Sequence, residues 1–325
     1  MDQKVALITG ISGQDGNYLA ALLLQKNYKV VGITRSSPDS ILPQLAYLGV
    51  RPQEIIWEQA DLLDYTQVAN LIATYRPTEI YNLAAQSSVS VSFKQPISTL
   101  NFNIMSVLNL LEAIRIGGLT TRFYQATSSE MYGTVPTLPI NEKMPLNPIS
   151  PYAISKSTAH YMVRNYREAY GLFACSGVLF NHESYLRRDG FFVNKIIKEA
   201  YLIQEGKQDK LLVGNLNVKR DFGFAPRYVE AMWLMLQQDL PDDYMVCSGT
   251  SIYLHEIVHY VFDRLGLDTN LIEISPALYR PTDIPDIYGD NTLAKQKLGW
   301  DYDMTFFEVL DIILAEEEQA RQKLK

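Results

Sequence analysis

The stretch LITGISGQDGNYLAALLL, residues 7–24, decides the fold of this chain. An apolar run leads into three regularly spaced glycines, and a helix-like pattern of apolar residues follows directly. In such a strand–turn–helix unit the first glycine permits a tight turn, the second lets the backbone approach a pyrophosphate, and the third lets helix and strand pack closely. The free N–H groups of the helix N-terminus then face the anion. We therefore predict a dinucleotide-binding turn made of Gly10, Ile11, Ser12, Gly13, Gln14, Asp15 and Gly16.

The polar pair Gln14 and Asp15 separates the last two glycines of this turn. Many glycine-rich turns carry apolar residues there, and a phosphate cradle alone explains only the glycines. We expect the two side chains to line the cofactor together with the backbone. A purely structural glycine-rich turn is the alternative.

Strand-like and helix-like segments alternate along the first half of the chain. This alternation predicts a parallel sheet that is covered on both faces, joined by right-handed crossovers. The expected strands are 4–10, 28–34, 54–60, 79–85, 122–128 and 173–180, and the expected helices are 14–27, 64–75, 100–116, 150–171 and a terminal one over 304–325. The fold class is α/β, a Rossmann-type doubly wound parallel sheet with a smaller, interleaved C-terminal α/β substrate domain. We place the cofactor-binding domain at 1–180 and the substrate domain mainly at 181–325, with segments near 216–240 returning to the first.

The composition of the chain limits the classes of protein to which it can belong. The chain has 325 residues, 47% of them hydrophobic, and a net charge of −7, which argues against a general nucleic-acid binder. No uninterrupted apolar run approaches the roughly 20 residues of a membrane-spanning helix. The N-terminus has no signal-peptide pattern, so a cytoplasmic enzyme is expected. Cys175 and Cys247 lie in apolar segments without metal-ligand spacing; we expect reduced core cysteines and no metal site.

The residues after the second expected strand indicate which dinucleotide cofactor binds. An acidic residue there would bond the ribose 2′-hydroxyl of NAD, but the sequence reads ITRSS over 33–37. The cation of Arg35 and the hydroxyl of Ser36 suit the 2′-phosphate of NADP, which makes NAD the less favoured alternative. A solvated surface arginine is the other interpretation. Asp61 and Leu62, which we expect to end the third strand, are placed at the adenine edge.

A catalytic group is predicted from the segment SPYAISKS, residues 150–157. Tyr152 and Lys156 share one helical face, and an ammonium beside a phenol is expected to lower the pKa of the phenol. Such a tyrosine can take the proton of an alcohol while hydride leaves the same carbon. Ser128, at the end of the fifth strand, would hydrogen-bond the reacting oxygen.

Glu130 distinguishes a dehydratase from a reductase or an epimerase. A reductase or epimerase needs no carboxylate at this point. A dehydratase does, because oxidation to a ketone acidifies the neighbouring C–H, and a carboxylate can remove that proton and then help to expel a β-hydroxyl. A glutamate that only solvates or caps the loop is the alternative.

These segments resemble the GDP-mannose 4,6-dehydratases of the extended short-chain dehydrogenase/reductase family. The resemblance covers nearly the whole chain and is carried by GISGQDGNYLA (10–20), NLAAQSSV (82–89), FYQATSSEMYG (123–133), SPYAISK (150–156), FNHES (180–184), GNLNVKRDFGFA (214–225), YVEAMWLMLQ (228–237) and YRP (279–281). It implies dehydration of GDP-mannose to GDP-4-keto-6-deoxy-mannose by internal hydride transfer through bound NADP. A dehydratase, reductase or epimerase of a related nucleotide sugar is the alternative.

The resemblance also implies residue roles. Ser128, Glu130, Tyr152 and Lys156 take the catalytic positions, Lys156 also holding the nicotinamide ribose. The implied cofactor contacts are Leu83, Ala84, Ala85, Ser87, His182 and Arg187. The implied substrate site contains Ser87, Ser128, Glu130, Tyr152, Asn181, Lys195, Arg220, Arg280 and Asp283.

The chain departs from the family pattern at several positions. Arg35 stands alone where the family usually has two arginines that help to build a tetramer, so a homodimer is expected and a tetramer is left open. On the substrate side, the unusual residues are Tyr185, Asn194, Phe222 and Asp283. They leave a related nucleotide sugar open as the substrate, and neither the base nor the sugar follows from the residues themselves.

Overall fold

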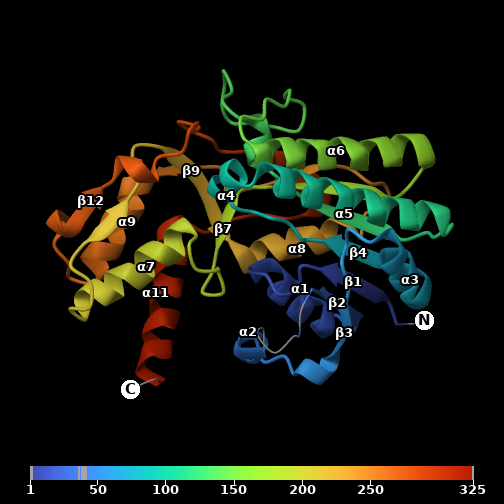
Figure 1. The fold of residues 1–325 in the computed structure, drawn as a ribbon, viewed down its shortest axis with the longest axis horizontal. Coiled ribbons are helices and arrows are strands. Elements are labelled where there is room, and N and C mark those ends of the chain that lie inside the picture. The colour runs from blue at the N-terminus through green and yellow to red at the C-terminus, as the bar shows by residue number, and fades with distance from the viewer. Residues whose placement is uncertain (1–2, 36, 38–41, 324–325) are drawn as a thin grey trace.

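The computed structural model describes residues 3–35, 37 and 42–323. Figure 1 shows two lobes, of which the larger is built on a twisted sheet and carries the N-terminus. The described part of the larger lobe contains a seven-stranded parallel sheet in the order β10–β6–β5–β4–β1–β2–β3. Its strands are β1 (Val5–Thr9), β2 (Lys29–Thr34), β3 (Ile55–Gln59), β4 (Glu79–Asn82), β5 (Arg122–Ser128), β6 (Ala174–Leu179) and β10 (Tyr244–Val246).

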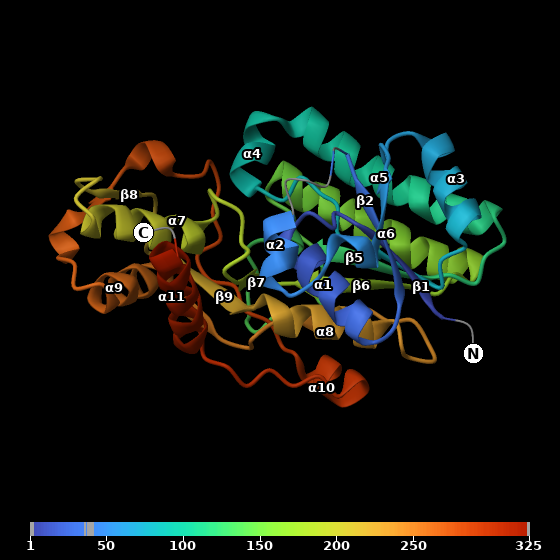
Figure 2. The same cartoon turned by 90° about the horizontal axis from the view of Figure 1, so that it is seen from below.

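Helices cover both faces of this sheet, as the alternation predicts (Figures 1 and 2). One face carries α1 (Gln14–Gln25) and α8 (Ala225–Met235), and α2 (Leu42–Tyr47) lies against α1. The other face carries α3 (Tyr65–Tyr75), α5 (Pro96–Ile116) and α6 (Pro151–Tyr170), and the short α4 (Val89–Lys94) contacts α5 and α6. The Rossmann-type fold class is therefore confirmed. Helix α8 packs against α1, and β10, which lies beyond the predicted segment 216–240, extends the sheet beside β6.

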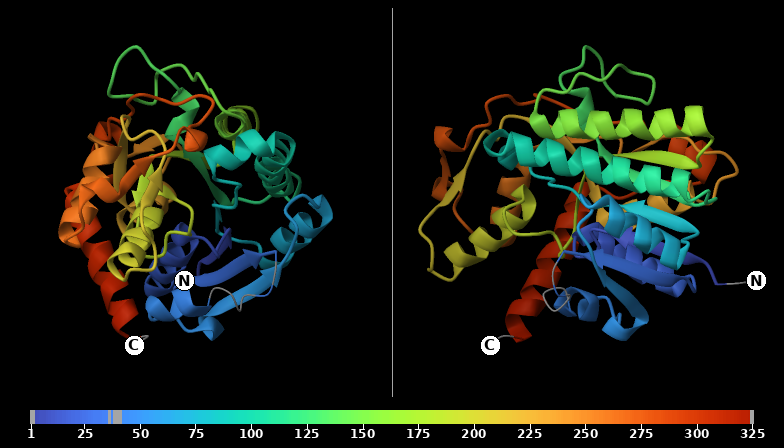
Figure 3. Two further views of the ribbon diagram at one scale, coloured as in Figure 1. Left: turned by 60° about the vertical axis from the view of Figure 1, so that its left-hand side comes forward. Right: turned by 45° about the vertical axis from the view of Figure 1, so that its right-hand side comes forward.

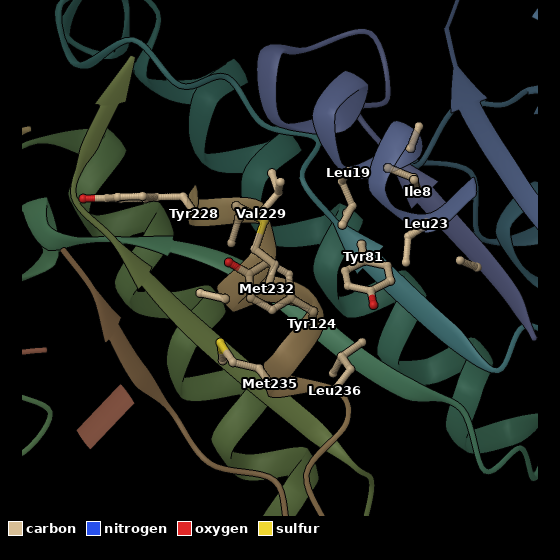
Figure 4. Close-up of a cluster of buried hydrophobic side chains, with 14 of the residues drawn as sticks. Ile8, Leu19, Leu23, Tyr81, Tyr124, Tyr228, Val229, Met232, Met235 and Leu236 are labelled. Atoms are coloured by element: carbon tan, nitrogen blue, oxygen red, sulfur yellow. The ribbon is translucent and has the colours of Figure 1, made fainter. Parts of the chain in front are cut away.

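Buried apolar side chains hold α1 and α8 on the sheet. Figure 4 shows Leu19 and Leu23 of α1 beside Ile8 of β1, with Met232 and Met235 of α8 in the same cluster. All five are essentially inaccessible to water. Burial of one such side chain stabilises a fold by about 1.5–3 kcal/mol, so this layer fixes α1 at the end of β1. Cys175 and Cys247 are also buried and free, as expected.

The smaller lobe packs beside the carboxyl ends of the sheet strands (Figures 1 and 3). Strands β7 and β9 run parallel, β11 pairs antiparallel with β9, and β12 pairs with β8. The strands are β7 (Asn181–Glu183), β8 (Leu211–Val213), β9 (Lys219–Phe224), β11 (Ser251–Tyr253) and β12 (Ile272–Ile274). The helices of this half of the chain are α7 (Phe192–Gln204), α9 (Leu254–Arg264), α10 (Thr292–Leu298) and α11 (Phe306–Lys323). Of these, α10 contacts β10 and α8 of the larger lobe. A second core lies between α7, α9 and α11. The domain boundary at residue 180 stays a prediction.

Two differences from the expected boundaries bear on function. β4 ends at Asn82 rather than at residue 85, because residues 83–87 leave the sheet and line a cavity. β3 ends at Gln59, so the prediction that Asp61 and Leu62 end this strand is wrong; both follow it in a turn.

Helix α5 begins at Pro96, one turn before the expected start, where proline needs no backbone partner. By length and composition alone it is apolar enough to cross a membrane, but half of the relevant window is buried inside the protein. It packs on α3 and α6, which identifies it as a core helix of this fold.

Candidate active site

A cavity of about 520 Å³ opens where the sheet strands end and the smaller lobe begins. Nearly all predicted site residues line it, although they come from segments far apart in the sequence. They are Gly10, Ser12, Gly13, Gln14, Asp15, Gly16, Arg35, Leu62, Leu83, Ala84, Ala85, Ser87, Ser128, Glu130, Tyr152, Lys156, Asn181, His182, Arg187, Lys195, Arg220, Arg280 and Asp283.

Three predicted residues are placed differently. Ile11 is fully buried beneath the glycine-rich turn and supports it from below. Asp61 lies in an adjoining hollow beside Arg35 and Gln67. Ser36 lies outside the described residues.

At each of the three positions of the turn, glycine meets a different steric requirement. Gly10 has a φ of +69°, and a Cβ there would lie 2.7 Å from the main-chain nitrogen of Ala84. A Cβ at Gly16 would lie 2.5 Å from the Gly10 carbonyl oxygen and from Ile11 Cα, which confirms that it permits close helix packing. A Cβ at Gly13 would meet only the Gly10 carbonyl oxygen, at 3.3 Å, and would otherwise project into the cavity. Gly13 therefore keeps the space at the N-terminus of α1 open.

The polar pair of the turn binds the smaller lobe as well as lining the cavity. Gln14 Nε2 donates to the His182 carbonyl oxygen at 3.1 Å, and Ser184 Oγ donates to Gln14 Oε1 at 2.8 Å. Asp15 Oδ2 lies 2.9 Å from His182 Nε2. The sequence left the individual bonds of the two side chains unassigned, and the structure shows that they fasten the turn to β7 and the residue after it.

Asp15 and His182 lie in contact at the edge of the cavity. His182 Nδ1 lies 2.7 Å from the Phe180 carbonyl oxygen, so both ring nitrogens face acceptors and both contacts are hydrogen bonds only in the doubly protonated ring. Burial alone would raise the pKa of Asp15, but His182, the Gln14 amide and the Arg187 cation outweigh it and lower this pKa to about 2. Asp15 is therefore ionised in the folded protein at neutral pH.

The predicted catalytic residues come together from three elements. Ser128 ends β5, and Glu130 lies in the short 3-10 helix Ser129–Tyr132 that follows directly. Tyr152 and Lys156 lie in the first turns of α6, where the Ser150 hydroxyl accepts the Ala153 N–H and so caps the helix. Since β5 and the start of α6 face the same cavity, all four side chains line it.

The pKa of Tyr152 is raised, whereas the sequence prediction has Lys156 lower it. Burial raises the pKa of Tyr152 to about 12, with hydrogen bonding to Ser128 acting in the opposite direction. The Lys156 Nζ atom lies 5.8 Å from the centre of the tyrosine ring and donates to the Ala126 carbonyl oxygen at 2.8 Å. Burial also lowers the pKa of Lys156 to about 8. The phenol is thus protonated in the protein as it stands, and the ammonium is oriented by the strand end.

The predicted substrate cations are tied to carboxylates. Arg280 Nη1 lies 3.8 Å from Glu130 Oε1 and 3.9 Å from Asp283 Oδ1. Arg220 is buried, pairs with Asp283 and also donates to the Ile284 carbonyl oxygen. Arg280 is therefore the more accessible of the two arginines, while Arg220 orients Asp283.

Lys195 and Asn181 also face the cavity, from α7 and β7. Lys195 Nζ donates to the Leu212 carbonyl oxygen and lies 3.9 Å from Glu199. Among the described residues, no group of three or more histidines, cysteines or carboxylates could hold a metal ion.

Asn103 of α5 is a functional residue that sequence reasoning missed. Its Nδ2 donates to Ser155 Oγ at 2.9 Å and to the Gln86 carbonyl oxygen at 3.1 Å, and its Oδ1 accepts the Gln86 N–H at 2.8 Å. Asn103 therefore connects the loop after β4 to the helix that carries Tyr152. A polar residue on the apolar face of a predicted core helix was the signal that could have found it.

Comparison with known proteins supports this geometry. A family model described as GDP-mannose 4,6 dehydratase matches residues 7–313. The chain is similar to GDP-mannose 4,6 dehydratase 2 of Arabidopsis thaliana, with 42% identity covering 99% of this chain and 89% of that protein. It is also 42% identical to GDP-mannose 4,6-dehydratase of Sinorhizobium fredii, over 92% of each chain.

Two solved structures share the fold. UDP-glucose 4-epimerase of Thermotoga maritima superimposes with a TM-score of 0.86 at 21% identity, covering 99% of this chain and 100% of that one. DesIV, a dTDP-glucose 4,6-dehydratase of Streptomyces venezuelae, superimposes with a TM-score of 0.87 at 20% identity, covering 98% of each.

We expect Asp15→Asn to destabilise the fold in a pH-dependent way. The pKa of Asp15 falls from 3.8 to about 2 on folding, so its contribution of about 2 kcal/mol is complete above pH 4 and is lost as the pH falls towards 2. Urea denaturation at a series of pH values should therefore show a stability difference between wild type and variant that shrinks in this range. The exposed Asp263→Asn serves as the control. A difference that is the same at every pH would contradict the assignment.

Proposed function

Because the chain belongs to the GDP-mannose 4,6-dehydratase family, we propose that it dehydrates GDP-mannose to GDP-4-keto-6-deoxy-mannose. The observation that carries this proposal is the position of Glu130 in one cavity with Ser128, Tyr152 and Lys156. An alcohol oxidation needs only the last three residues, and the carboxylate adds the capacity for elimination. The reaction releases water and is, in sum, neither an oxidation nor a reduction.

The cavity fits a nicotinamide dinucleotide. Gly13 leaves open space at the N-terminus of α1, where free N–H groups and the helix dipole favour a pyrophosphate. We propose NADP rather than NAD because Arg35 follows β2 and lies between the cavity and the adjoining hollow. Among the described residues, Arg35 forms no ion pair, and its guanidinium lies 5.5 Å from the centre of the Phe102 ring. When bound, the nicotinamide takes a hydride from C4 of the sugar and returns it to C6.

Tyr152 and Ser128 act on the sugar 4-hydroxyl. Ser128 holds the oxygen, and Tyr152 accepts its proton as the C4 ketone forms. The pKa of about 12 means that the phenol must first lose its own proton, so the site has to favour the phenolate once the ligands are in place. Lys156 contributes a cation fixed by the Ala126 carbonyl oxygen, and its pKa of about 8 keeps it mostly charged at pH 7.

Glu130 acts on the neighbouring carbon. The C4 ketone acidifies the C5 hydrogen, and the carboxylate removes this proton and delivers it to the leaving 6-hydroxyl, which departs as water. With hydride at C6, C5 would take a proton from solvent, and Tyr152 would release to solvent the proton that it accepted from the 4-hydroxyl, which leaves the 4-keto-6-deoxy sugar. Arg280 Nη1, 3.8 Å from Glu130 Oε1, helps to hold the carboxylate near the reacting carbons, and its cation suits the substrate diphosphate.

Purified protein supplied with GDP-mannose and a catalytic amount of NADP should form a product lighter by one water, as read by mass spectrometry. Glu130→Gln should oxidise the sugar without eliminating water, so absorbance at 340 nm should rise to at most one equivalent per site and remain there. The matched control Glu168→Gln, on the exposed face of α6, should turn over normally. Stoichiometric NADPH consumption by the wild type, or full turnover by Glu130→Gln, would refute the dehydratase mechanism.

The cofactor preference has its own test in Arg35→Asp. Loss of the cation and repulsion of the 2′-phosphate should lower the affinity for NADP by about 100-fold and change that for NAD far less. Isothermal titration with both dinucleotides measures the ratio. Arg51→Asp, the same change at an exposed site, should leave the ratio unaltered. An unchanged ratio in Arg35→Asp would show that Arg35 is a solvated surface residue.

We propose further that the protein is a homodimer in which α5 and α6 meet their copies in a second chain. These helices lie side by side in Figure 1 and expose large apolar side chains, among them Ile97, Met105, Ile154 and Tyr161. An apolar face of this kind is typical of a protein–protein interface.

Light scattering should therefore give about twice the mass of the 36.9 kDa chain. Tyr161→Glu should shift the mass towards that of one chain, because it places a charge in the interface, whereas Tyr279→Glu, an equally drastic change at an exposed tyrosine on the smaller lobe, should not. A wild-type protein of single-chain mass would contradict the proposal.

A further inference from the structure

Arg188 reaches across the cavity to the glycine-rich turn. It lies in the loop 184–191 between β7 and α7, and its Nη2 donates to the carbonyl oxygen of Ser12 at 3.3 Å and to Ser12 Oγ at 3.2 Å. Ser12 lies in the turn between β1 and α1, 176 residues earlier in the chain. One exposed side chain thus connects the loop 184–191 to the glycine-rich turn, and both of its ends line the cavity.

The backbone on both sides of Arg188 is held in place. Asn194 Nδ2, from the first turn of α7, donates to the Arg187 carbonyl oxygen and lies 3.3 Å from Asp189 Oδ1. Lys198, one turn further along α7, pairs with Asp189. Both neighbours of Arg188 are therefore anchored to α7, which restricts where its side chain can lie and distinguishes it from a loosely solvated surface arginine.

The charges around Arg188 call for an anion. Its neighbour Arg187 is paired with buried Glu183 at 3.4 Å, whereas in the part of the chain that the structure describes Arg188 forms no ion pair. Its contacts with Ser12 use Nη2 alone and leave its other N–H groups for a further acceptor. The guanidinium thus lies at the positive end of α1, where the Asp15 carboxylate is bound by His182, and among the described residues no negative group pairs with the guanidinium. A pyrophosphate seated on Gly13 would supply that group.

We propose that Arg188 binds the pyrophosphate of the dinucleotide from the side opposite the glycine-rich turn and acts, through Ser12, as a clasp that slows its release. This inference rests on the proposed function, which places a dinucleotide in this cavity. A guanidinium that grips a phosphate and the adjacent turn together must break both sets of contacts before the dinucleotide leaves. The clasp therefore affects the lifetime of the complex and not the chemistry on the sugar.

Arg188→Gln tests this role. Titration of the nucleotide-free protein should show an affinity for NADP that is lower by about 10-fold, and a displacement measurement should show a dissociation rate that is higher by a similar factor. Adenosine 2′-monophosphate lacks the pyrophosphate and should bind wild type and variant equally. Arg188→Lys keeps the charge without the planar fork and should lie between the two. Arg264→Gln, at an exposed position of α9, is the matched control and should bind both ligands as the wild type does.

The possible results distinguish a failure of the clasp from a failure of the proposed function. If Arg188→Gln leaves the NADP affinity and dissociation rate unchanged while the wild type dehydrates GDP-mannose, the clasp is overturned. The proposed function then remains intact. An equal loss for NADP and adenosine 2′-monophosphate would also overturn it, because the effect would then not involve the pyrophosphate. A wild-type protein that binds neither NADP nor NAD would overturn the proposed function and the clasp together. If Arg188→Gln melts at a lower temperature than the wild type, the same comparison is made with Arg188→Lys.

Discussion

The hydrogen bonds between the glycine-rich turn and the segment at 182–184 are the constraint on which the rest of the site depends. Gln14 and Asp15 sit at the start of α1, and their partners begin the smaller lobe. These contacts bring together the glycine-rich turn and the elements that carry Arg187 and Lys195. Because these hydrogen bonds are directional and largely buried, they hold one geometry more strictly than apolar packing between two lobes would. The cavity between the lobes is defined by this junction.

Much of the fold follows from local patterns in the sequence. The alternating strands and helices, the separate tasks of Gly10 and Gly16, and the convergence of the predicted residues on one cavity all agree with the structure. The order of strands and helices predicts this convergence because parallel strands place their carboxyl ends at one edge of the sheet. The family resemblance supplied the candidates from the smaller lobe, where short strands and loops leave little periodic signal.

Three features could not be predicted because they depend on distant partners. The bonds of Gln14 join positions 168 and 170 residues apart. The pKa of Tyr152 depends on how deeply α6 buries the phenol, and burial outweighs the lowering that its spacing from Lys156 suggests. Arg220 looks like a free substrate cation in the sequence, but its donors are used by Asp283 and the Ile284 carbonyl oxygen.

The central claim is that one cavity carries out oxidation, elimination and reduction on a single sugar, with the hydride never leaving the site. GDP-mannose labelled with deuterium at C4 tests this most directly. The account predicts that mass spectrometry and NMR of the product find the deuterium at C6, in the new methyl group, even when unlabelled NADPH is present in excess. Loss of the label to solvent or to free cofactor would contradict it.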